Sequence, residues 1–567
     1  MRAMMRAGWM IGVTLGMGAT AAEVTAERGM VVTTSGTGAA RAGVAMLEKG
    51  GNAMDAALTA ALLQPCVAAG SYVSYAGIIN VVYFDAKSGR VFDLNAGYNT
   101  VREETEPLTI PGIDPAALAA DNLHAFDSPP SGRTALVPGY FGGVAAAHAK
   151  FGKRTFAELL APAIDCAEKG FPLSPELAGM MKSRQSVLQR LPATRAVFTR
   201  PDGELYAAGD TFRQPELAKT LRAVAKHGAD HIYRGAWTKE FVEALRSEGG
   251  KMTLTDLEAY LPTWIDPVHG TFNGHDVYAH GLPSRGGVAL IEGLNLATVA
   301  NLAALPPYGE SPLKLFRIAQ FAKLGAILNA PGVAPQMEKA LGFELSPVAR
   351  IRPDTANKLW PLLDAGSIPI IPAPRKLTTA HSDGVVAVDR QGNVAAIVHT
   401  INTVNWGSTG IFVGGISIPD SAAFQQALIA SVPPGTRLPD DTSPGLVIRD
   451  GKPVLGFSAI GAGLHVRTLG ALLDTLAHGM SPQQAIASPA LGGLDFSRAA
   501  AGEIGLTVGN SDFSAQYLQQ LRELGQPVIE DDLQRGYWIG IAVNAGKPRL
   551  KGGALREISM GGDAAGY

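Results

Sequence analysis

The amino-acid sequence predicts a layered α+β sandwich, in which helices cover the outer faces of β-sheets. Strand pairs separated by short turns occur in both halves of the chain, and helical patterns accompany them in both halves. The composition permits such a fold, because 46% of the residues are hydrophobic and only 17% are charged, which favours a buried core over disorder. The length of 567 residues exceeds what one simple core usually holds.

The first half of the chain combines one strand, a hairpin and many helices. A strand is expected at 30–34, and a hairpin at 78–94 with its turn at 86–89. The apolar residues of the other segments recur with helical spacing. Helices are expected at 39–49, 53–64, 138–151, 156–169, 174–191, 214–227, 237–248 and 254–259.

The second half begins with a Pro-rich segment and continues with hairpins. Residues 331–375 show no sustained periodicity, and proline resists both helix and central strand, so the sequence predicts an extended, loosely held arm. Downstream, the alternation of apolar residues predicts two hairpins, the second around an Asp-Gly turn. The expected strands are 384–390, 394–401, 446–449, 453–457 and 537–544, and the expected helices are 463–478 and 481–488.

The N-terminus has the features of a secretory signal peptide. Arg2 and Arg6 precede an apolar stretch at 9–17, and the small residues of 19–21 follow it. We therefore expect residues 1–22 to be a signal peptide and the mature protein to be periplasmic or secreted. No later stretch reaches the roughly 20 apolar residues of a membrane span, so none is predicted in the mature protein.

Charge and cysteine content exclude several classes of function. A formal net charge of −2 provides no basic surface to hold nucleic acid or an anionic membrane. The two cysteines, Cys66 and Cys166, lie in Ala/Leu-rich helical stretches, so we expect buried free thiols, although one disulfide is compatible with export. The sequence contains neither Cys-x-x-Cys nor His-Glu-x-x-His, and we predict no metal and no other cofactor.

One hydroxyl residue stands where a strand begins after the Pro-rich arm. His381, Ser382 and Asp383 directly precede the predicted strand 384–390. If the peptide bond before Ser382 is cut, Ser382 gains an α-amine with a pKa of roughly 7.7–8.0, which can take the proton from its own hydroxyl. The three consecutive residues cannot form a Ser-His-Asp triad with one another, and no Gly-x-Ser-x-Gly elbow is present.

Several separated blocks of the sequence resemble, in the right order, the γ-glutamyltransferase (γ-glutamyltranspeptidase) family. The blocks are 29–33, 42–43, 47–57 (LEKGGNAMDAA), 137–139 (VPG), 148–152, 160–163, 168–175 (EKGFPLSP), 388–394 (VDRQGNV), 400–403 (TINT), 442–444 (TSP) and 564–567. They extend over nearly the whole mature chain.

The resemblance implies an N-terminal-nucleophile hydrolase with a four-layer αββα sandwich, made of two subunits from one precursor. The large subunit would be 23–381 and the small subunit 382–567, with the cut between His381 and Ser382. The family's nucleophile is a threonine, and a register without gaps from Val388 and Asp389 places Ser382 at that position. Thr378 and Thr379 are the alternatives, but they require an insertion before the strand.

By the same register, Thr400 resembles the threonine that positions the nucleophile and the new amine. Asn402 resembles the asparagine that holds the substrate. The family binds the oxyanion of the reaction with backbone amides of adjacent glycines, and Ile460 and Gly461 occupy the corresponding positions. We expect this stretch, 458–463, to be a loop between a strand and a helix N-terminus.

The substrate-binding positions depart from the family pattern. The family's paired serines are Asp440 and Asp441, and its glutamine and aspartate are replaced within 419–424, a stretch that contains the candidate Ser421 and also Phe424. The carboxylate-binding arginine is absent near Asn95, and Arg102 is the nearby cation. These departures predict a self-processing acyltransferase or amidohydrolase that acts on a small amide or peptide with a cationic or neutral acyl group. Water or an amine would accept the acyl group. The alternative is an unprocessed binding protein of the same fold, which the missing threonine and the altered glycine loop support.

Overall fold

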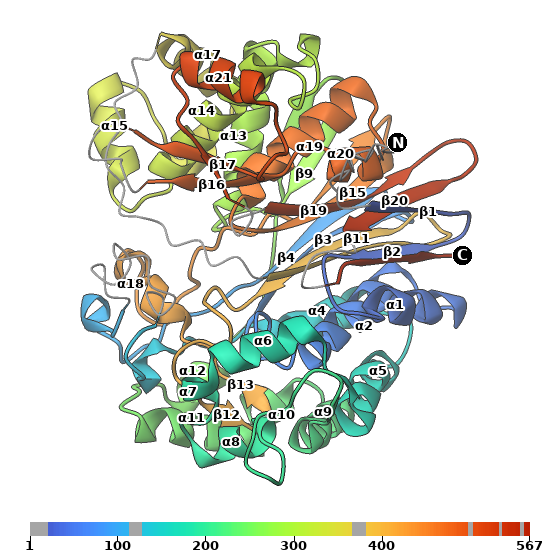
Figure 1. Ribbon diagram of the computed structural model, residues 1–567, viewed down its shortest axis with the longest axis vertical. Coiled ribbons are helices and arrows are strands. Elements are labelled where there is room, and N and C mark those ends of the chain that lie inside the picture. Colours follow the sequence, from blue (N-terminus) through green and yellow to red (C-terminus); the bar gives the residue numbers. More distant parts are fainter. Residues whose placement is uncertain (1–20, 113–126, 366–381, 497–502, 532–535, 556–560) are drawn as a thin grey trace, which may run out of the picture.

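A computed structural model describes residues 21–112, 127–365, 382–496, 503–531, 536–555 and 561–567. Two seven-stranded sheets lie face to face, and helices cover both outer faces (Figure 1). The first sheet has the order β21 (Asp563–Gly566), β2 (Met30–Thr33), β10 (Ser382–Val388), β11 (Val394–Thr400), β3 (Ile78–Asp85), β4 (Arg90–Ala96) and β7 (Thr263–Ile265). The second has the order β1 (Ala21–Ala26), β20 (Leu550–Leu555), β19 (Gly536–Val543), β15 (Lys452–Gly461), β14 (Gly445–Arg449), β9 (His275–Ala279) and β8 (Val268–Phe272).

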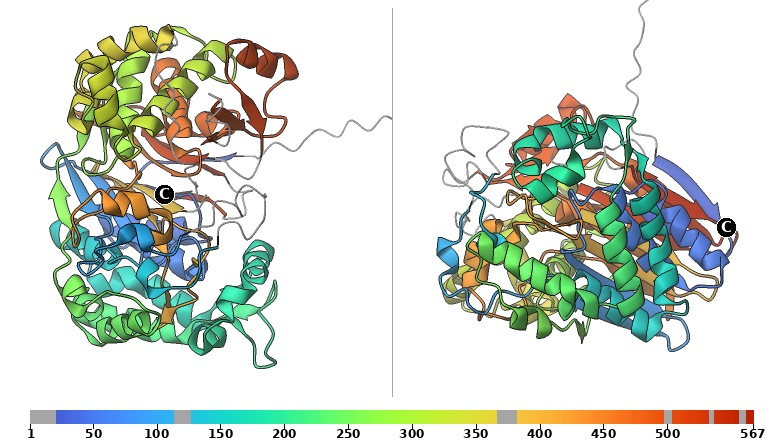
Figure 2. Two further views of the ribbon diagram at one scale, coloured as in Figure 1. Left: turned by 90° about the vertical axis from the view of Figure 1, so that its left-hand side faces the viewer. Right: turned by 90° about the horizontal axis from the view of Figure 1, so that it is seen from below.

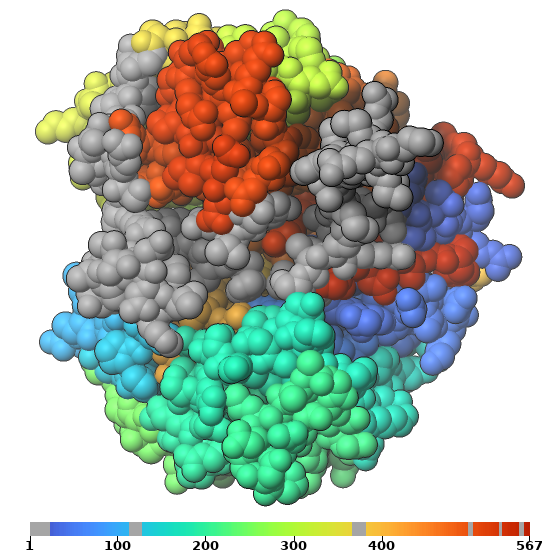
Figure 3. Space-filling model, viewed as in Figure 1, coloured from blue at the N-terminus to red at the C-terminus, as the bar shows by residue number. Residues whose placement is uncertain are grey.

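The two helical layers lie above and below the sheets in Figure 1 and in the left view of Figure 2. The layer on the first sheet contains α1 (Ala39–Glu48), α2 (Ala53–Val67), α4 (Tyr140–Phe151), α5 (Phe156–Lys169), α9 (Pro215–His227) and α11 (Ala236–Ser247). The layer on the second contains α13 (Gly286–Val299), α14 (Pro312–Leu328), α17 (Pro353–Asp364), α19 (Leu464–His478), α20 (Pro482–Ala487) and α21 (Ala515–Glu523). On the face in Figure 3, residues of the second layer form the upper orange-red lobe and α6 (Pro175–Ser183) belongs to the lower, teal lobe.

Shorter elements complete the two lobes. The short helices are α7 (Gln185–Leu188), α8 (Pro192–Phe198), α10 (Asp230–Tyr233), α12 (Leu254–Glu258), α15 (Val333–Leu341), α16 (Pro347–Arg350) and α18 (Gln426–Ala430). The small sheets are formed by β5 (Phe171–Pro172) with β6 (Thr211–Phe212), β12 (Phe412–Val413) with β13 (Ile416–Ser417), and β16 (Leu491–Asp495) with β17 (Gly505–Val508) and β18 (Val528–Glu530).

The alternation of side chains along the central strand β10 shows why the molecule has four layers. Val385 and Ala387 pack among the helices of the first layer. Val386 and Val388 pack in the core between the two sheets. Because successive side chains of a strand point to opposite faces, a continuous apolar run becomes a strand that is buried on both sides. The predicted α+β sandwich with αββα layers is confirmed.

The Pro-rich arm is a correction to the sequence-based prediction. Residues 333–341, 347–350 and 353–364 form the helices α15, α16 and α17, so the part of 331–375 that the structure describes is mainly helical. Pro347 of α16 and Pro353 of α17 stand in the first helical turn, where the missing N–H costs nothing and the fixed φ favours the helix. Pro361 lies inside α17. The predicted extended stretch 368–374 lies outside the described residues.

The cysteines are a second correction. Cys66 at the end of α2 and Cys166 in α5 form a disulfide with their Cα atoms 6.5 Å apart. Both stretches are helical, as predicted, but their spacing along the sequence gave no sign that the two helices pack side by side. The predicted free thiols are therefore wrong.

Strand β1 is an element that the sequence analysis did not predict. It pairs with β20 from Ala21 to Ala26 and so begins at the end of the predicted signal peptide, most of which lies outside the described residues. Among the residues that the structure places, no helix is long and apolar enough to cross a membrane.

Candidate active site

Ser382 and Thr400 face each other at one end of the central hairpin of the first sheet. Ser382 is the first residue of β10, Thr400 is the last of β11, and the two are direct partners in the antiparallel register. The Ser382 hydroxyl donates a hydrogen bond to Thr400 Oγ1 over 2.8 Å. The backbone N–H of Asn402 donates to the same Thr400 oxygen over 3.1 Å. Three residues that the sequence singled out thus come together.

The side chain of Ser382 belongs to the strand face that looks toward the second sheet. Gly384, two residues along, lies against Ser458 of β15, and a Cβ on Gly384 would approach Ser458 Oγ to 2.4 Å. A Cβ on Gly456 would lie 2.9 Å from Val386. Strands β10 and β15 therefore run in opposite directions across the interface between the two sheets. Since 386 faces 456 and 384 faces 458, two residues further along Ser382 faces Ile460.

The predicted oxyanion segment has a different local structure from the one expected. Residues 458–461 form the end of strand β15, in which Ile460 and Gly461 pair with Tyr537 and Gly536 of β19, and only two residues separate the strand from α19. Gly461 has a φ of 89°, a left-handed conformation that glycine adopts without strain and that turns the chain toward the helix. The expected loop is thus wrong for 458–461. The role of the two amides stays a prediction.

The opposite face of the hairpin carries a buried acid that the sequence analysis did not include in the site. Asp383 is fully buried, and it accepts hydrogen bonds from the hydroxyls of Ser35 and Thr34, both on Oδ1. The Tyr72 hydroxyl donates to Ser35 Oγ over 3.3 Å. Burial raises the pKa of Asp383 to about 7, against the lowering effect of Ser35 and Thr34. Its carboxyl is therefore poised to change charge near neutral pH.

The cross-strand partner of Asp383 is a buried histidine, His399. Its Nε2 lies 2.8 Å from Gln64 Oε1, and the Gln64 amide donates to the carbonyl of Ser35 over 3.0 Å. Burial lowers the pKa of His399 to about 3, so its imidazole is neutral at physiological pH. Strand alternation could have placed Asp383 and His399 on this face, but nothing in the sequence indicated their partners.

Asp440 and Asp441, the predicted substrate-binding acids, are paired within the protein. Asp440 is buried and accepts hydrogen bonds from Asn80, at 3.0 Å, and from the hydroxyls of Thr442, at 2.6 Å, and Ser284, at 3.3 Å. Asp441 forms an ion pair with Arg285 at 3.1 Å. Both carboxylates thus have partners in the protein before any substrate binds.

The remaining predicted substrate-binding residues also have internal partners. Ser421, in a short 3₁₀ turn, donates to the carbonyl of Ile401 over 2.5 Å, which places it beside Asn402 along the chain. Arg102 is half exposed and lies 3.8 Å from the Asp256 carboxylate. The structure therefore keeps Ser421 near the hairpin end and engages Arg102 at the surface.

A buried His–Asp pair lies beside Asn95, near which the resemblance led us to expect an arginine. His280 Nδ1 lies 2.6 Å from Asp93 Oδ1, and its Nε2 lies 3.2 Å from the Asn95 amide. Burial opposes a charge on the imidazole, but Asp93 outweighs it, and the pKa of His280 is raised. This pair was missed because its two residues are 187 positions apart.

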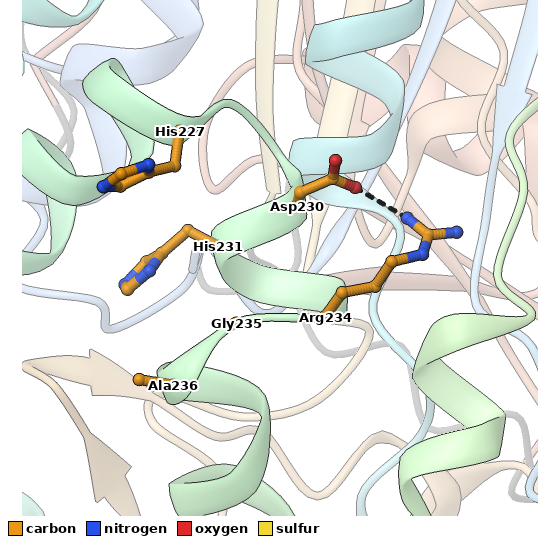
Figure 4. A pocket seen from close by; sticks show the side chains of 6 residues that line it. All are labelled: His227, Asp230, His231, Arg234, Gly235 and Ala236. Atoms are coloured by element: carbon orange, nitrogen blue, oxygen red, sulfur yellow. Dashed lines mark hydrogen bonds and ion pairs between the residues drawn. The ribbon is translucent and has the colours of Figure 1, made fainter.

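A surface pocket of about 370 Å³ lies in the lower helical layer, away from the hairpin end. Figure 4 shows the imidazoles of His227 and His231 on one side and the Asp230–Arg234 ion pair, at 2.7 Å, on the other. None of its lining residues belongs to the Ser382 neighbourhood. Within the described ranges no cluster of three or more His, Cys, Asp or Glu could hold a metal ion.

The two facing sheets, with a hydroxyl residue at the start of a central strand, define a sandwich of the N-terminal-nucleophile hydrolase class. The crystal structure of cephalosporin acylase from Bacillus halodurans has this fold: it is 21% identical, with a TM-score of 0.77 over 96% of this chain and 97% of that one. Residues 39–557 match the gamma-glutamyltranspeptidase family model, and the chain belongs to this family.

Curated relatives cover most of the chain at modest identity. A glutathione hydrolase proenzyme of Pseudomonas sp. (strain A14) is 26% identical over 497 residues, 83% of this chain and 82% of the relative. An acylase ACY 1 proenzyme of Pseudomonas sp. (strain SE83) is 25% identical over 481 residues, 82% of each. The protein is therefore an enzyme, a γ-glutamyltransferase-like hydrolase or acyltransferase.

Proposed function

We propose that this chain is the precursor of an amide-cleaving acyltransferase whose nucleophile is the new N-terminal residue Ser382. The observation that carries the proposal is the hydrogen bond from Ser382 Oγ to Thr400 Oγ1 at the end of the two central strands. It brings the hydroxyl of Ser382 against a second hydroxyl, that of Thr400, at the start of the proposed small subunit. The names of the relatives, which are proenzymes, support processing.

The maturation step is an acyl shift followed by hydrolysis. Ser382 Oγ attacks the carbonyl carbon of His381, the C–N bond breaks, and the Ser382 nitrogen leaves as an amine that takes the hydroxyl proton. The resulting ester is hydrolysed by water, which gives a carboxylate on His381 and frees Ser382 Oγ. Thr400 accepts the hydroxyl hydrogen bond that fixes the direction of attack.

The catalytic cycle uses the same atom. Ser382 Oγ attacks the amide carbonyl of the substrate while the Ser382 α-amine takes its proton, and the tetrahedral oxyanion is held by the Ile460 and Gly461 amides. The α-amine then gives the proton to the leaving amine, and an acyl-enzyme ester remains. Water or a second amine attacks the ester with the α-amine as base and releases the acyl group.

The acyl group, we infer, is neutral and lacks the α-amino and α-carboxyl groups of a γ-glutamyl unit. Asp440 is bound by Asn80, Thr442 and Ser284, and Asp441 by Arg285, so neither is poised to grip a cation. Arg102 is engaged by Asp256. The imidazole of His280 is already paired with Asp93, so it does not offer a free cation to a substrate carboxylate.

We also propose that the enzyme is exported, with residues 1–22 removed. The disulfide between Cys66 and Cys166 supports this, because structural disulfides persist in oxidising compartments. Fractionation of expressing bacterial cells checks it: the chain is expected outside the cytoplasm with a new N-terminus near residue 23. An intact N-terminus in the cytoplasmic fraction contradicts export.

Mass spectrometry of the purified chain tests the processing. Two polypeptides are expected, the smaller beginning at Ser382, and Ser382→Ala is expected to remain one chain. Thr378→Ala and Thr379→Ala are matched controls that should process normally. A smaller chain that begins at Thr378 or Thr379 reassigns the nucleophile, whereas an intact wild-type chain favours the unprocessed binding protein.

A pair of anilides tests the acyl group. One carries a γ-glutamyl group, and the other carries an acyl group of the same length without the α-amino and α-carboxyl groups. The mature enzyme should release aniline faster from the second, and Ser382→Ala from neither. Faster release from the γ-glutamyl anilide would show that the acyl group is the family's own.

A further inference from the structure

Asp383 is a buried carboxyl group with an incomplete set of partners. The hydroxyls of Ser35 and Thr34 both donate hydrogen bonds to the same carboxyl oxygen, Oδ1. Among the described residues, none hydrogen-bonds to Oδ2. Buried polar atoms without partners are rare in native proteins and call for an explanation.

The groups that face Asp383 offer it no positive charge. The titratable side chains around it are Tyr72 beyond α2, Tyr140 on α4 and His399 on β11. Burial raises the pKa of both tyrosines and lowers that of His399 to about 3, so all three are neutral near pH 7. In the part of the chain that the structure describes, no Lys or Arg pairs with Asp383.

We propose that Asp383 is the counter-charge for the α-ammonium group that processing creates at Ser382. The inference rests on the proposed function, because only cleavage before Ser382 makes this cation. The two groups belong to consecutive residues, whose Cα atoms are about 3.8 Å apart. Since the Asp383 side chain points away from Ser382 Oγ and into the helix-facing layer, it touches no substrate and acts as a positioning residue.

The precursor and the mature enzyme then differ in the charge of Asp383. In the precursor, burial without a neighbouring cation favours the neutral acid form of Asp383. After the cut, the ammonium favours the carboxylate, and the carboxylate favours the ammonium. Amine and carboxyl share protons as one coupled pair around neutral pH, and the pair sets the pH at which the amine becomes free to act as a base.

The pH dependence of kcat/KM tests this pairing. Asp383→Asn keeps an oxygen for Ser35 and Thr34 but removes the negative charge that favours the ammonium. The acidic limb of the pH profile of kcat/KM is therefore expected to move to lower pH by about one unit. Asp389→Asn is the matched control, because it makes the same change at the other end of β10 and should leave the limb in place. A structural role alone lowers activity at every pH without moving the limb.

Infrared spectroscopy provides a second measurement that does not need the Asp383 variant to mature. The full-length Ser382→Ala precursor is expected to show the carbonyl band of a protonated, buried carboxyl at about pH 6. The band should vanish in Ser382→Ala/Asp383→Asn and be absent from the mature wild-type enzyme at the same pH. The same band in precursor and mature enzyme, or its absence from both, overturns the proposal.

The two proposals fail in different ways. A wild-type chain that stays uncut contradicts the processing at Ser382 and removes the ammonium with it. If the chain is cut before Ser382 but the acidic limb of its kcat/KM profile is the same in wild type and Asp383→Asn, only the role of Asp383 is contradicted.

Discussion

One aspartate, Asp383, stands near the start of strand β10 and another, Asp389, directly follows its end, and the two carboxyl groups are held in opposite ways. Asp389 accepts hydrogen bonds on both oxygens, from the backbone N–H groups of Gln391, Asn393 and Ala53 and from the Asn393 amide. Asp383 accepts from two hydroxyls on one oxygen. A carboxylate saturated by N–H donors stabilises a turn, whereas a half-satisfied acid is left able to respond to a new charge.

The difference follows from what each end of the strand does. At the Asp389 end, the chain turns back into β11 and meets the N-terminus of α2, where N–H groups without helical partners are plentiful. At the Ser382 end, we propose that the chain is cut. The carboxylate with the most hydrogen-bond donors thus lies at the end of the strand away from the proposed cut.

The largest expected effect comes from removing the hydroxyl that faces Ser382. Thr400→Val keeps the shape of the side chain but deletes the acceptor of the 2.8 Å hydrogen bond. We expect processing and turnover to fall by about 100-fold or more, because a nucleophile misplaced by about an ångström loses that much. Thr400→Ser retains the hydroxyl and should keep most of the activity. Time courses of cleavage and anilide release measure both, and equal rates for Thr400→Val and wild type contradict the site.

The next largest effect is expected when Asp383 or Asp389 is replaced by alanine, and it concerns the free energy of unfolding rather than the reaction rate. In the uncut Ser382→Ala background, Asp389→Ala should lower the free energy of unfolding by about 3 kcal/mol, since it leaves several buried N–H groups unpaired. Asp383→Ala should cost no more than about 1 kcal/mol, because hydroxyls can reorient toward other acceptors. Urea unfolding compares them, and equal losses would remove the distinction between the two ends.

The pH dependence of precursor stability sharpens the same comparison. The pKa of Asp383 is raised to about 7 in the folded chain, against about 3.9 when unfolded. Between these values the folded chain holds a proton that the unfolded chain has released, so stability is full below about pH 4 and falls as the pH rises to 7. We expect Ser382→Ala to lose about 3 kcal/mol more over this range than Ser382→Ala/Asp383→Asn. Parallel stability profiles of the two variants contradict the raised pKa.

The sequence predicted the hairpins and their layers because strand alternation and turn residues are local signals. The pairing of β10 with β11 followed from two apolar stretches around a Gln-Gly-Asn turn, and this pairing brought Ser382 and Thr400 together. Resemblance supplied their roles. The helices of 333–364 were missed because prolines in a first turn and prolines that break a helix look alike in a sequence.

The buried partners of the site could not be predicted, since they join distant segments. Asp383 meets Ser35 across 348 positions and His399 meets Gln64 across 335. Nothing local in either sequence window signals the partner. The disulfide between Cys66 and Cys166 is hidden in the same way, because its formation depends on how α2 packs on α5.

The smallest expected effect tests the close approach of Gly384 in β10 to Ser458 in β15. The placement of Ile460 opposite Ser382 was inferred from this approach. Gly384→Ala puts a Cβ 2.4 Å from Ser458 Oγ, and overpacking of this kind should cost about 1 kcal/mol. Ser458→Ala removes the clashing oxygen and leaves its own Cβ 3.1 Å from the new one. The double variant should therefore be more stable than the sum of the single losses, by a coupling energy that a double-mutant cycle in urea measures. Strict additivity would show that β10 and β15 do not face each other at this pair, and the placement of Ile460 opposite Ser382 would lose its basis.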